Sequence, residues 1–563
     1  MDPMTTTYDD LPYDSGAFWP VHPDRLAVTA CLHDVRTAPV ERCRVLELGC
    51  GCGENIIPMA AYLPQSQFTG IDLSSRQIDQ ARATAGELGL ANLRLTRQDI
   101  LDFDGEGGPF DYILCHGVYS WVPPPVRARI LDICRRHLAE RGVAMISHNV
   151  YPGWHLNMIV RDVLEFGAAG ANAAAQRLRQ GMGFLDFLCR HLPQADTPYG
   201  ARIREAADYL RQQADHYVYH EFLEEVNSPG YFLDFAAAAG QTDLQYVGDA
   251  LLQDVRPYLS GDAMRTIEAQ FGDPLKQEQV LDFLSGRAFR HSLLCRKSVP
   301  VRWPVRHEAI AHLWLRATCR PESAGPDQAG PPARATPPRG EGLPSLRSTS
   351  RFLTGKGQRA TIEDPFLQAA LEALCAALPA AVACADLLAA VAAQQARASQ
   401  RSSNAPNGSS TQAGQDRNSC TQAGRADGFG RELSRNGSHT EALLAAAATG
   451  LVHLHSWAPP LAWPAPPRPA AWPLVRWQAR RSSRVVTPWH QTVQLDPIAQ
   501  SLVPFLDGRT DRAQLGEQLL RLANEKKLAL ADGQDLELST QNVPSIVDAF
   551  LEGLARACLL GPG

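Results

Sequence analysis

A run of apolar residues that breaks into alternating glycines is the stretch of this sequence best suited to hold a ligand. It spans residues 45–53, where Glu47 is followed by Gly49, Gly51 and Gly53, and a helical pattern comes next. Glycines allow positive φ angles and a close approach of a ligand to the backbone, while the start of the helix offers free N–H groups. The spacing E-x-G-x-G-x-G differs from the dinucleotide fingerprint G-x-G-x-x-G, because Glu54 stands where the third glycine would be.

Two further acidic residues follow predicted strands in an order that suits this turn. Asp72 closes the strand at 67–72, where a carboxylate can accept both hydroxyls of a ribose. Asp99 follows the strand at 93–97 and can accept from the exocyclic amine of an adenine. Glu47 can steady the turn or meet the ammonium of a bound amino acid. Each acid alone could be a cap or a solvated loop residue. Together with the glycines they predict a nucleoside joined to an amino acid, which is the shape of S-adenosylmethionine (SAM).

The elements that must position these residues alternate between strand and helix patterns over residues 43–149. Strands are expected at 45–48, 67–72, 93–97, 110–115 and 143–148. Ser74 begins a helix with the spacing of a capping box, and Gly142 is expected just past the end of another helix. Such alternation is typical of a parallel sheet with crossover helices, so the predicted class is α/β with a Rossmann-like doubly wound domain. Ligands of such sheets bind outside the C-terminal strand ends.

Composition limits the remaining possibilities. A chain of 563 residues with 45% hydrophobic residues can bury several cores, so more than one domain is expected. A net charge of -6 gives no electrostatic reason to expect nucleic acid as a partner. The thirteen cysteines are scattered and contain no C-x-x-C pair, which favours a reducing cytoplasm and no metal. The N-terminus lacks the apolar region of a secretory signal and no later apolar stretch is long enough to span a bilayer, so a cytoplasmic protein is expected.

Several segments outside the glycine turn support a resemblance to a known family. Residues 43–149 resemble a class I SAM-dependent methyltransferase domain, and the flanking motifs resemble bacterial methyltransferases that carry a methyltransferase regulatory domain. Characterised members similar to this chain are protein lysine methyltransferases that act on bacterial outer-membrane proteins. The resemblance therefore implies SAM as cofactor and a protein substrate, such as an outer-membrane or surface protein. The segments that carry it are 6–13, 110–123, 147–154, 220–232 and 286–294. His148 stands where many relatives show Tyr.

The residues after the fourth strand are the candidates for catalysis. Methyl transfer from a sulfonium is an in-line displacement, so the enzyme must aim a deprotonated nucleophile at the methyl group. A lysine has a reference pKa of about 10.4 and must be desolvated or lose its proton to a base. His116 could relay that proton, Tyr119 could hydrogen-bond the amine, and Trp121 could hold a cation against its ring. The alternative is that this aromatic cluster packs the sheet edge.

Further candidates lie before and after the predicted sheet. Tyr8, Tyr13 and Trp154 are predicted to contribute to the wall of the substrate pocket. A zinc site on the helix that contains His216, His220 and Glu224 is disfavoured, because Glu224 stands where H-E-x-x-H requires its second histidine. That helix face is expected to pack at a domain interface, and the helical region around it could wall the substrate entrance.

The chain is predicted to fold as several parts. The last part is compatible with a winged-helix-like module, which by the resemblance to this family would serve protein contacts. The absence of a dense Lys/Arg stripe argues against the alternative of reading DNA. The linkers are rich in Pro, Gly, Ser and Asn and cannot bury enough apolar surface to fold. The parts are an N-terminal flap (1–30), the methyltransferase domain (31–165), a mainly helical regulatory domain (166–315), a linker (316–350), a helical segment (351–395), a second linker (396–440) and the winged-helix-like domain (441–563).

Three functions stay open at this point. The preferred one is methylation of lysine side chains of proteins, because a small-metabolite enzyme would not need such large additions. The second is methylation of a small-molecule O- or N-acceptor, which a narrow, closed pocket would favour. The third is a non-catalytic SAM-binding regulator, which occluded methyl-facing residues would favour. The sequence leaves the methylation state of the product and the oligomeric state undetermined.

Overall fold

The computed structural model describes residues 11, 16–192, 197–251, 259–322, 350–355, 357–403, 438–525, 538–539 and 541–562. These residues form two compact units, each considered by itself. The first contains Met1–Leu251, Leu259–Val305 and Pro459–Gly563, and the second includes Arg306–Ala458. Most of the two predicted linkers, 316–350 and 396–440, lies outside the described residues. Their ends are corrected, because residues 319–321 form a strand and one helix continues to Ser403.

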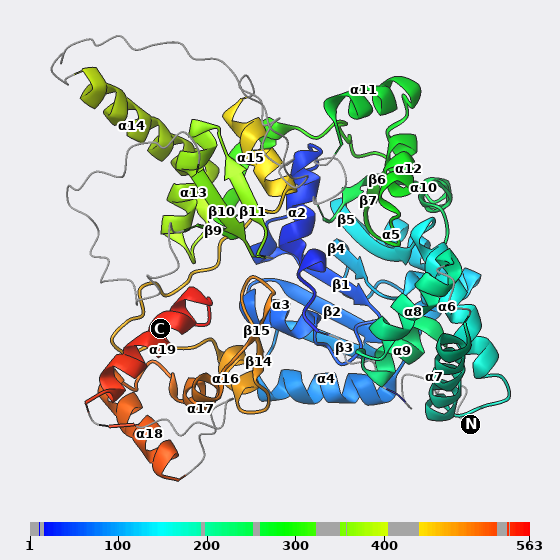
Figure 1. Cartoon of the computed structure of the whole chain (residues 1–563), viewed down its shortest axis with the longest axis horizontal. Coiled ribbons are helices and arrows are strands. Elements are labelled where there is room, and N and C mark those ends of the chain that lie inside the picture. Colours follow the sequence, from blue (N-terminus) through cyan, green and yellow to red (C-terminus); the bar gives the residue numbers. More distant parts are fainter. Residues whose placement is uncertain are drawn as a thin grey trace. The chain divides into compact units, whose positions relative to one another are not determined.

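A seven-stranded sheet in the order β3-β2-β1-β4-β5-β7-β6 is the centre of the first unit (Figure 1). Strands β1 to β5 pair in parallel, which confirms the doubly wound prediction. Their bounds are β1 (Arg44–Leu48), β2 (Gln67–Asp72), β3 (Leu93–Arg97), β4 (Phe110–Cys115) and β5 (Leu138–Asn149). The crossover helices are α3 (Ile56–Tyr62), α4 (Ser75–Glu87) and α5 (Pro124–His137).

Local sequence signals account for two details of this sheet. The Ser74 side chain accepts a hydrogen bond from the Gln77 N–H, so the predicted cap of α4 is confirmed. The helix-end role expected for Gly142 is wrong, since α5 ends at His137 and Gly142 lies inside β5. A Cβ at Gly142 would come within 2.8 Å of the Phe110 carbonyl oxygen. The glycine is therefore needed where two neighbouring strands approach closely.

The region expected to be mainly helical also contributes two strands to this sheet. β7 (Phe289–Arg296) pairs antiparallel with β5, and β6 (Leu244–Asp249) pairs antiparallel with β7. Both strands are nearly continuous buried runs and therefore lack the alternating pattern by which a strand is recognised. The helical patterns around them led to the helical prediction. Seven α-helices stand among the described residues of this region: α6 (Gly153–Gly167), α7 (Ala174–His191), α8 (Pro198–Leu210), α9 (Asp215–Phe222), α10 (Phe232–Gln241), α11 (Gly261–Gln270) and α12 (Pro274–Ser285).

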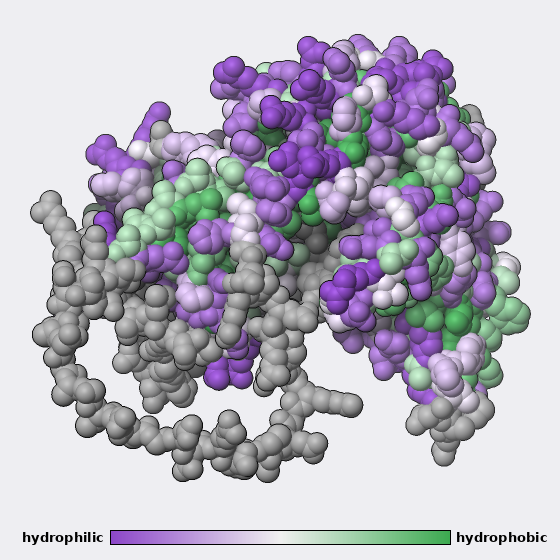
Figure 2. Space-filling view, turned by 90° about the horizontal axis from the view of Figure 1, so that it is seen from above, coloured by the Kyte–Doolittle hydropathy of each residue, from purple (hydrophilic) through white to green (hydrophobic). Residues whose placement is uncertain are grey.

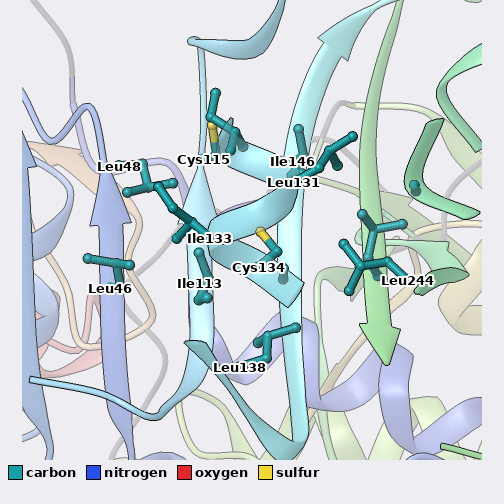
Figure 3. Packing of buried hydrophobic residues seen from close by; sticks show 14 of the residues in the cluster. Leu46, Leu48, Ile113, Cys115, Leu131, Ile133, Cys134, Leu138, Ile146 and Leu244 are labelled. Atoms are coloured by element: carbon teal, nitrogen blue, oxygen red, sulfur yellow. The ribbon is translucent and has the colours of Figure 1, made fainter. Parts of the chain in front are cut away.

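The main core of the first unit lies between the sheet and the helices on its faces. Leu46 of β1 and Ile113 of β4 pack with Ile133 of α5, as the close-up shows (Figure 3). Leu244 of β6 belongs to the same cluster, so the regulatory region shares one core with the methyltransferase domain. The N-terminal helix α2 (Pro23–Leu32) is also buried along nearly its whole length.

The last part of the chain packs within the first unit around its own core. Its elements are α16 (Pro473–Ala479), β14 (Arg484–Val486), β15 (Thr492–Gln494), α17 (Pro497–Leu502), α18 (Arg512–Asn524) and α19 (Val543–Arg556). β14 and β15 form an antiparallel hairpin. The apolar faces of α18 and α19 meet in that core.

The second unit corrects two predicted boundaries. The segment expected to be helical from residue 351 begins with the hairpin of β10 (Ser350–Thr354) and β11 (Arg359–Ile362), to which β9 (Cys319–Pro321) adds a third strand. Two helices then follow, α13 (Pro365–Ala377) and α14 (Cys384–Ser403).

The start of the last domain is the second boundary to change. α15 (His439–Ala448) and β13 (Val452–His455) belong to the second unit, where β13 pairs with β8 (Trp314–Ala317) beside β12 (Val382–Ala383). The last domain therefore begins near residue 459 rather than 441. Strand pairing across more than a hundred residues decides this boundary, and local composition does not carry that information.

Many hydrophobic side chains are buried in these cores, and some large ones, such as Phe166 and Leu156, are exposed. The face shown in Figure 2 is largely polar, with apolar residues gathered in smaller patches. Within the described part of the chain, every helix is too short or too polar to cross a lipid bilayer.

Candidate active site

The glycine turn between β1 and α3 is built as its sequence predicts. Gly49, Gly51 and Gly53 have φ angles of +75°, +53° and +81°, a region that side-chain-bearing residues rarely adopt. A Cβ at Gly49 would lie 2.5 Å from Val118 Cγ2, and one at Gly53 would lie 2.7 Å from Ile57 Cδ1. Among the residues that the structure describes, a Cβ at Gly51 would meet nothing closer than Gln77 Oε1, at 3.9 Å. Gly49 and Gly53 are therefore required by packing, whereas open space lies beside Gly51.

The predicted ribose and adenine acids lie on adjacent strands beside this turn. One oxygen of Asp72, at the end of β2, accepts the Gly51 N–H at 2.9 Å, and the other accepts the Ser74 N–H at 2.9 Å. Asp99 follows β3, is half-buried and accepts the Leu101 N–H at 2.9 Å. Asp72 thus braces the glycine turn, and it lies at the strand end where the sequence predicts the ribose site.

Glu47 presents a buried carboxylate that is only half satisfied. Its Oε1 accepts the Asn55 Nδ2–H at 2.7 Å, and its Oε2 is buried with no hydrogen-bond partner among the described residues. Burial raises the pKa of Glu47 to about 8, although the hydrogen bond from Asn55 opposes the shift. An unpaired buried acceptor is costly. A ligand that brings a cation to this point would relieve that cost.

These features fit SAM. The open space beside Gly51 suits a ligand backbone, Asp72 offers acceptors for a ribose, and the unpaired Glu47 Oε2 suits an ammonium. Asn55 was not predicted, although its position directly after the glycine turn is a usable signal. It stands at the N-cap of α3 without capping it, because its side chain is turned to Glu47 instead.

His116, at the end of β4, lies in a layer of stacked rings. Phe18 stacks on it with centroids 4.5 Å apart, and His291 of β7 stacks at 5.7 Å. Its Nδ1 is 3.1 Å from Ser147 Oγ, which also accepts the Gly117 N–H. Burial, and then the neighbouring His291, lower the pKa of His116 to about 3. The ring is therefore neutral near pH 7. Neither Phe18 nor His291 was singled out by the sequence, because tertiary pairing brings them here.

Tyr119 and Trp121 occupy a short 3-10 turn, η4 (Tyr119–Trp121), that follows β4. The Tyr119 ring meets Phe235 of α10 edge-on at 5.4 Å, and burial raises its pKa to about 12. The Trp121 ring meets Trp154 edge-on at 6.0 Å. Both side chains are half-buried, so each has a packed side and an accessible side.

The other predicted residues have different surroundings. Trp154 is buried among Trp121 and Phe222, so it supports Trp121 from behind. Tyr8 and Tyr13 lie outside the described residues. His148 is buried, stacks on Phe235 at 4.0 Å and has its Nε2 3.0 Å from Ser292 Oγ.

The regulatory region reaches this site directly. The Ser228 N–H donates to the Ser120 carbonyl at 2.8 Å, and the Tyr151 N–H donates to the Gly230 carbonyl at 3.0 Å. The helix face considered for zinc is used in packing: His220 is buried, with Nδ1 2.6 Å from Glu224 Oε1 and Nε2 2.6 Å from the Leu11 carbonyl.

Comparisons with known protein families match three parts of the chain. Residues 45–142 match a methyltransferase domain, 214–296 match a predicted methyltransferase regulatory domain, and 467–559 match the family described as PKMT, C-terminal winged helix domain. The regulatory match covers β6 and β7, so that domain supplies the antiparallel edge of the sheet.

Individual relatives and one solved structure extend these matches. Protein RP028 of Rickettsia prowazekii is 37% identical over 233 residues, which is 41% of this chain and 93% of that protein. Protein RP789 of the same organism is 36% identical over 305 residues, and this match spans only 55% of its length. The structure of PKMT2 from Rickettsia typhi in complex with AdoHcy has a TM-score of 0.77 and 22% identity, covering 98% of this chain and 100% of that one. At this identity the likeness shows the fold.

The doubly wound sheet, the glycine turn and the acids around it define a class I methyltransferase fold, whose methyl donor is SAM. The chain belongs to the family of SAM-dependent methyltransferases that carry a methyltransferase regulatory domain and a PKMT-type C-terminal winged-helix domain.

Proposed function

We propose that this protein transfers methyl groups from SAM to lysine side chains of a protein substrate. The observation that carries the proposal is the combination of a methyltransferase domain, a regulatory domain and a winged-helix domain of the PKMT family in one chain. PKMT2 of Rickettsia typhi shares this fold over nearly its whole length. An outer-membrane or surface protein is the proposed class of substrate, by resemblance to the characterised relatives.

The cofactor is proposed to bind across the C-terminal ends of β1, β2 and β3. Glu47 receives the ammonium, Asp72 the ribose hydroxyls and Asp99 the adenine amine, while Gly49, Gly51 and Gly53 bring the backbone close. When bound, SAM supplies an electrophilic methyl group on a sulfonium. No further activation of the donor is needed, so this chain's own task is to align and deprotonate the acceptor.

His116, Tyr119 and Trp121 are proposed to receive the lysine. The half-buried aromatic surroundings withdraw the ammonium from water, which lowers its pKa toward the neutral amine that attacks. Tyr119 keeps its proton near pH 7, so its hydroxyl can hydrogen-bond the amine. His116 is neutral, so it can relay a proton only if one ring nitrogen accepts a proton while the other releases one. The accessible side of the Trp121 ring offers a face to the cation.

Label transfer tests the proposal. The full chain is incubated with methyl-labelled SAM and, separately, with an outer-membrane protein fraction and with the small-molecule fraction of its host. Label on lysine residues of intact proteins, identified by mass spectrometry and absent with the Asp72→Ala variant, supports the proposal. Label only in the small-molecule fraction would favour the small-acceptor alternative. No transfer by a chain that binds SAM would favour the non-catalytic regulator.

A further inference from the structure

The turn of the β14–β15 hairpin is buried, although it belongs to the C-terminal domain. Residues 485–490 are all buried. The Tyr62 hydroxyl of α3 donates to the Val486 carbonyl at 2.5 Å, and the His22 and His490 rings lie 5.1 Å apart. At the rim, the Trp477 indole N–H donates to Glu87 at 2.7 Å. The hairpin is thus packed against α3, the helix that follows the glycine turn.

His490, at the tip of this hairpin, has an unusual backbone. Its φ is +57°, a left-handed conformation that costs a residue with a side chain about 1 kcal/mol or more. Two hydrogen bonds fix the turn: the His490 N–H donates to the Thr487 carbonyl at 2.9 Å, and the Thr487 N–H donates to the Gln491 carbonyl at 2.9 Å. The result of this geometry is that the imidazole points out of the hairpin, with Nε2 2.7 Å from Asn55 Oδ1.

The hydrogen bonds around Asn55 have one consistent direction. The Phe18 N–H donates to Asn55 Oδ1 at 3.2 Å, so this atom is the amide oxygen. His490 Nε2 must then carry a hydrogen and donate to the same oxygen. The Asn55 Nδ2–H in turn donates to Glu47 Oε1 at 2.7 Å. A continuous chain therefore runs from His490 through Asn55 to Glu47, whose other oxygen is unpaired.

We propose that His490 is a positioning residue for the cofactor: it holds the Asn55 amide so that Glu47 presents Oε2 to the ammonium of SAM. This inference rests on the proposed function in taking Glu47 as the ammonium site. His490 and Asn55 are 435 residues apart in the chain. The C-terminal domain then completes the cofactor site, in addition to any contact it makes with a protein substrate.

Two variants of the full chain separate the effect of the His490 N–H donor from the effect of the left-handed backbone at this position. His490→Gly accepts the left-handed φ without strain and removes the imidazole, whereas His490→Gln retains an N–H donor of similar reach. Calorimetry with S-adenosylhomocysteine should give a Kd roughly threefold to tenfold higher for His490→Gly, the size of one lost hydrogen bond. His490→Gln should restore most of the affinity. Methylthioadenosine, which has the nucleoside but no amino acid, should bind both variants and the parent protein equally.

Two controls decide between positioning and simple docking. Tyr62→Phe removes a hydrogen bond to the same hairpin without touching Asn55, and it should leave both affinities unchanged. The positioning role is wrong if Tyr62→Phe weakens the binding of S-adenosylhomocysteine as much as His490→Gly does. It is also wrong if His490→Gly weakens the binding of both ligands equally. Glu47→Gln should weaken S-adenosylhomocysteine alone. If it does not, the ammonium site itself is misassigned, a failure distinguishable from one confined to His490.

Discussion

Asp72 braces the glycine turn and is the proposed ribose acceptor, and its substitution should expose both roles. Asp72→Ala removes the proposed ribose acceptors and should cost about 2–4 kcal/mol of SAM binding if both bonds are charge-assisted. It also releases the Gly51 and Ser74 N–H groups, so some loss of stability is expected. Asp72→Asn keeps the shape and one acceptor and should lose less. Calorimetry that shows unchanged SAM affinity for Asp72→Ala would contradict the assignment.

If Glu47 receives the ammonium as proposed, cofactor binding should depend on pH. Its pKa of about 8 in the free protein means that it is mostly protonated at pH 7, while an adjacent ammonium would favour the carboxylate. Binding at pH 7 should therefore release a proton, and the affinity should rise between pH 6 and 7.5. Calorimetry in two buffers of different ionisation enthalpy measures the proton. Glu47→Gln should abolish the release, and a release that persists in this variant would point to another group.

The same shift has a consequence for the free protein. The folded pKa of about 8 lies above the ordinary value of 4.5, so protonated Glu47 stabilises the fold. That contribution is complete below about pH 4.5 and is lost as the pH rises through 8. Saturating SAM should reduce this loss, since the ligand supplies the positive charge instead.

Tyr119 and Trp121 should differ in their kinetic effects. Tyr119→Phe removes the hydroxyl that we propose meets the acceptor, so it should lower kcat while leaving SAM affinity unchanged. Trp121→Ala should raise the acceptor KM, and the contact with Trp154 adds a loss of stability of roughly 3 kcal/mol or more if the ring acts as core. Steady-state kinetics and urea unfolding measure both. An unchanged kcat for Tyr119→Phe would reduce Tyr119 to a packing role against Phe235.

At the scale of elements, the glycine turn separates packing from binding. Gly51→Ala and Gly53→Ala both strain a positive φ, but only the new methyl group at Gly53 meets Ile57, at 2.7 Å. Gly53→Ala should therefore be less stable than Gly51→Ala by about 1–3 kcal/mol. Gly51→Ala should instead weaken SAM, because its methyl group projects into the open space. Unfolding curves and calorimetry on both variants measure the stability and the SAM affinity. If Gly51→Ala proves the less stable variant and Gly53→Ala the weaker SAM binder, Gly51 does not line the cofactor site.

At the scale of the whole molecule, the packing of the C-terminal hairpin against α3 should contribute to stability. Tyr62→Phe leaves the Val486 carbonyl without its donor inside a buried contact, which should cost about 1–2 kcal/mol. Tyr62 also packs with Leu474 and Val486, and the ring of phenylalanine preserves that contact. Urea unfolding of the full chain provides the measurement. An unchanged free energy of unfolding would mean that water satisfies Val486 equally well.

Strands that are marked by residues within or directly after them could be predicted from the sequence. Four of the five strands were placed to within one residue, because apolar runs followed by Gly49–Gly53, Asp72 or Asp99 mark strand ends without help from elsewhere. The methyltransferase class follows from the same residues, and the family matches support it.

Features that depend on contacts between segments far apart in the chain could not be predicted from the sequence and came from the tertiary structure. It placed β6 and β7 in the sheet, moved the start of the last domain to near residue 459, and brought Phe18, His291 and His490 to the site. No local pattern singles out these three residues, although His291 lies in a segment that carries the family resemblance. Their roles come from burial and from hydrogen bonds made across hundreds of residues, and these are fixed by how the whole chain packs.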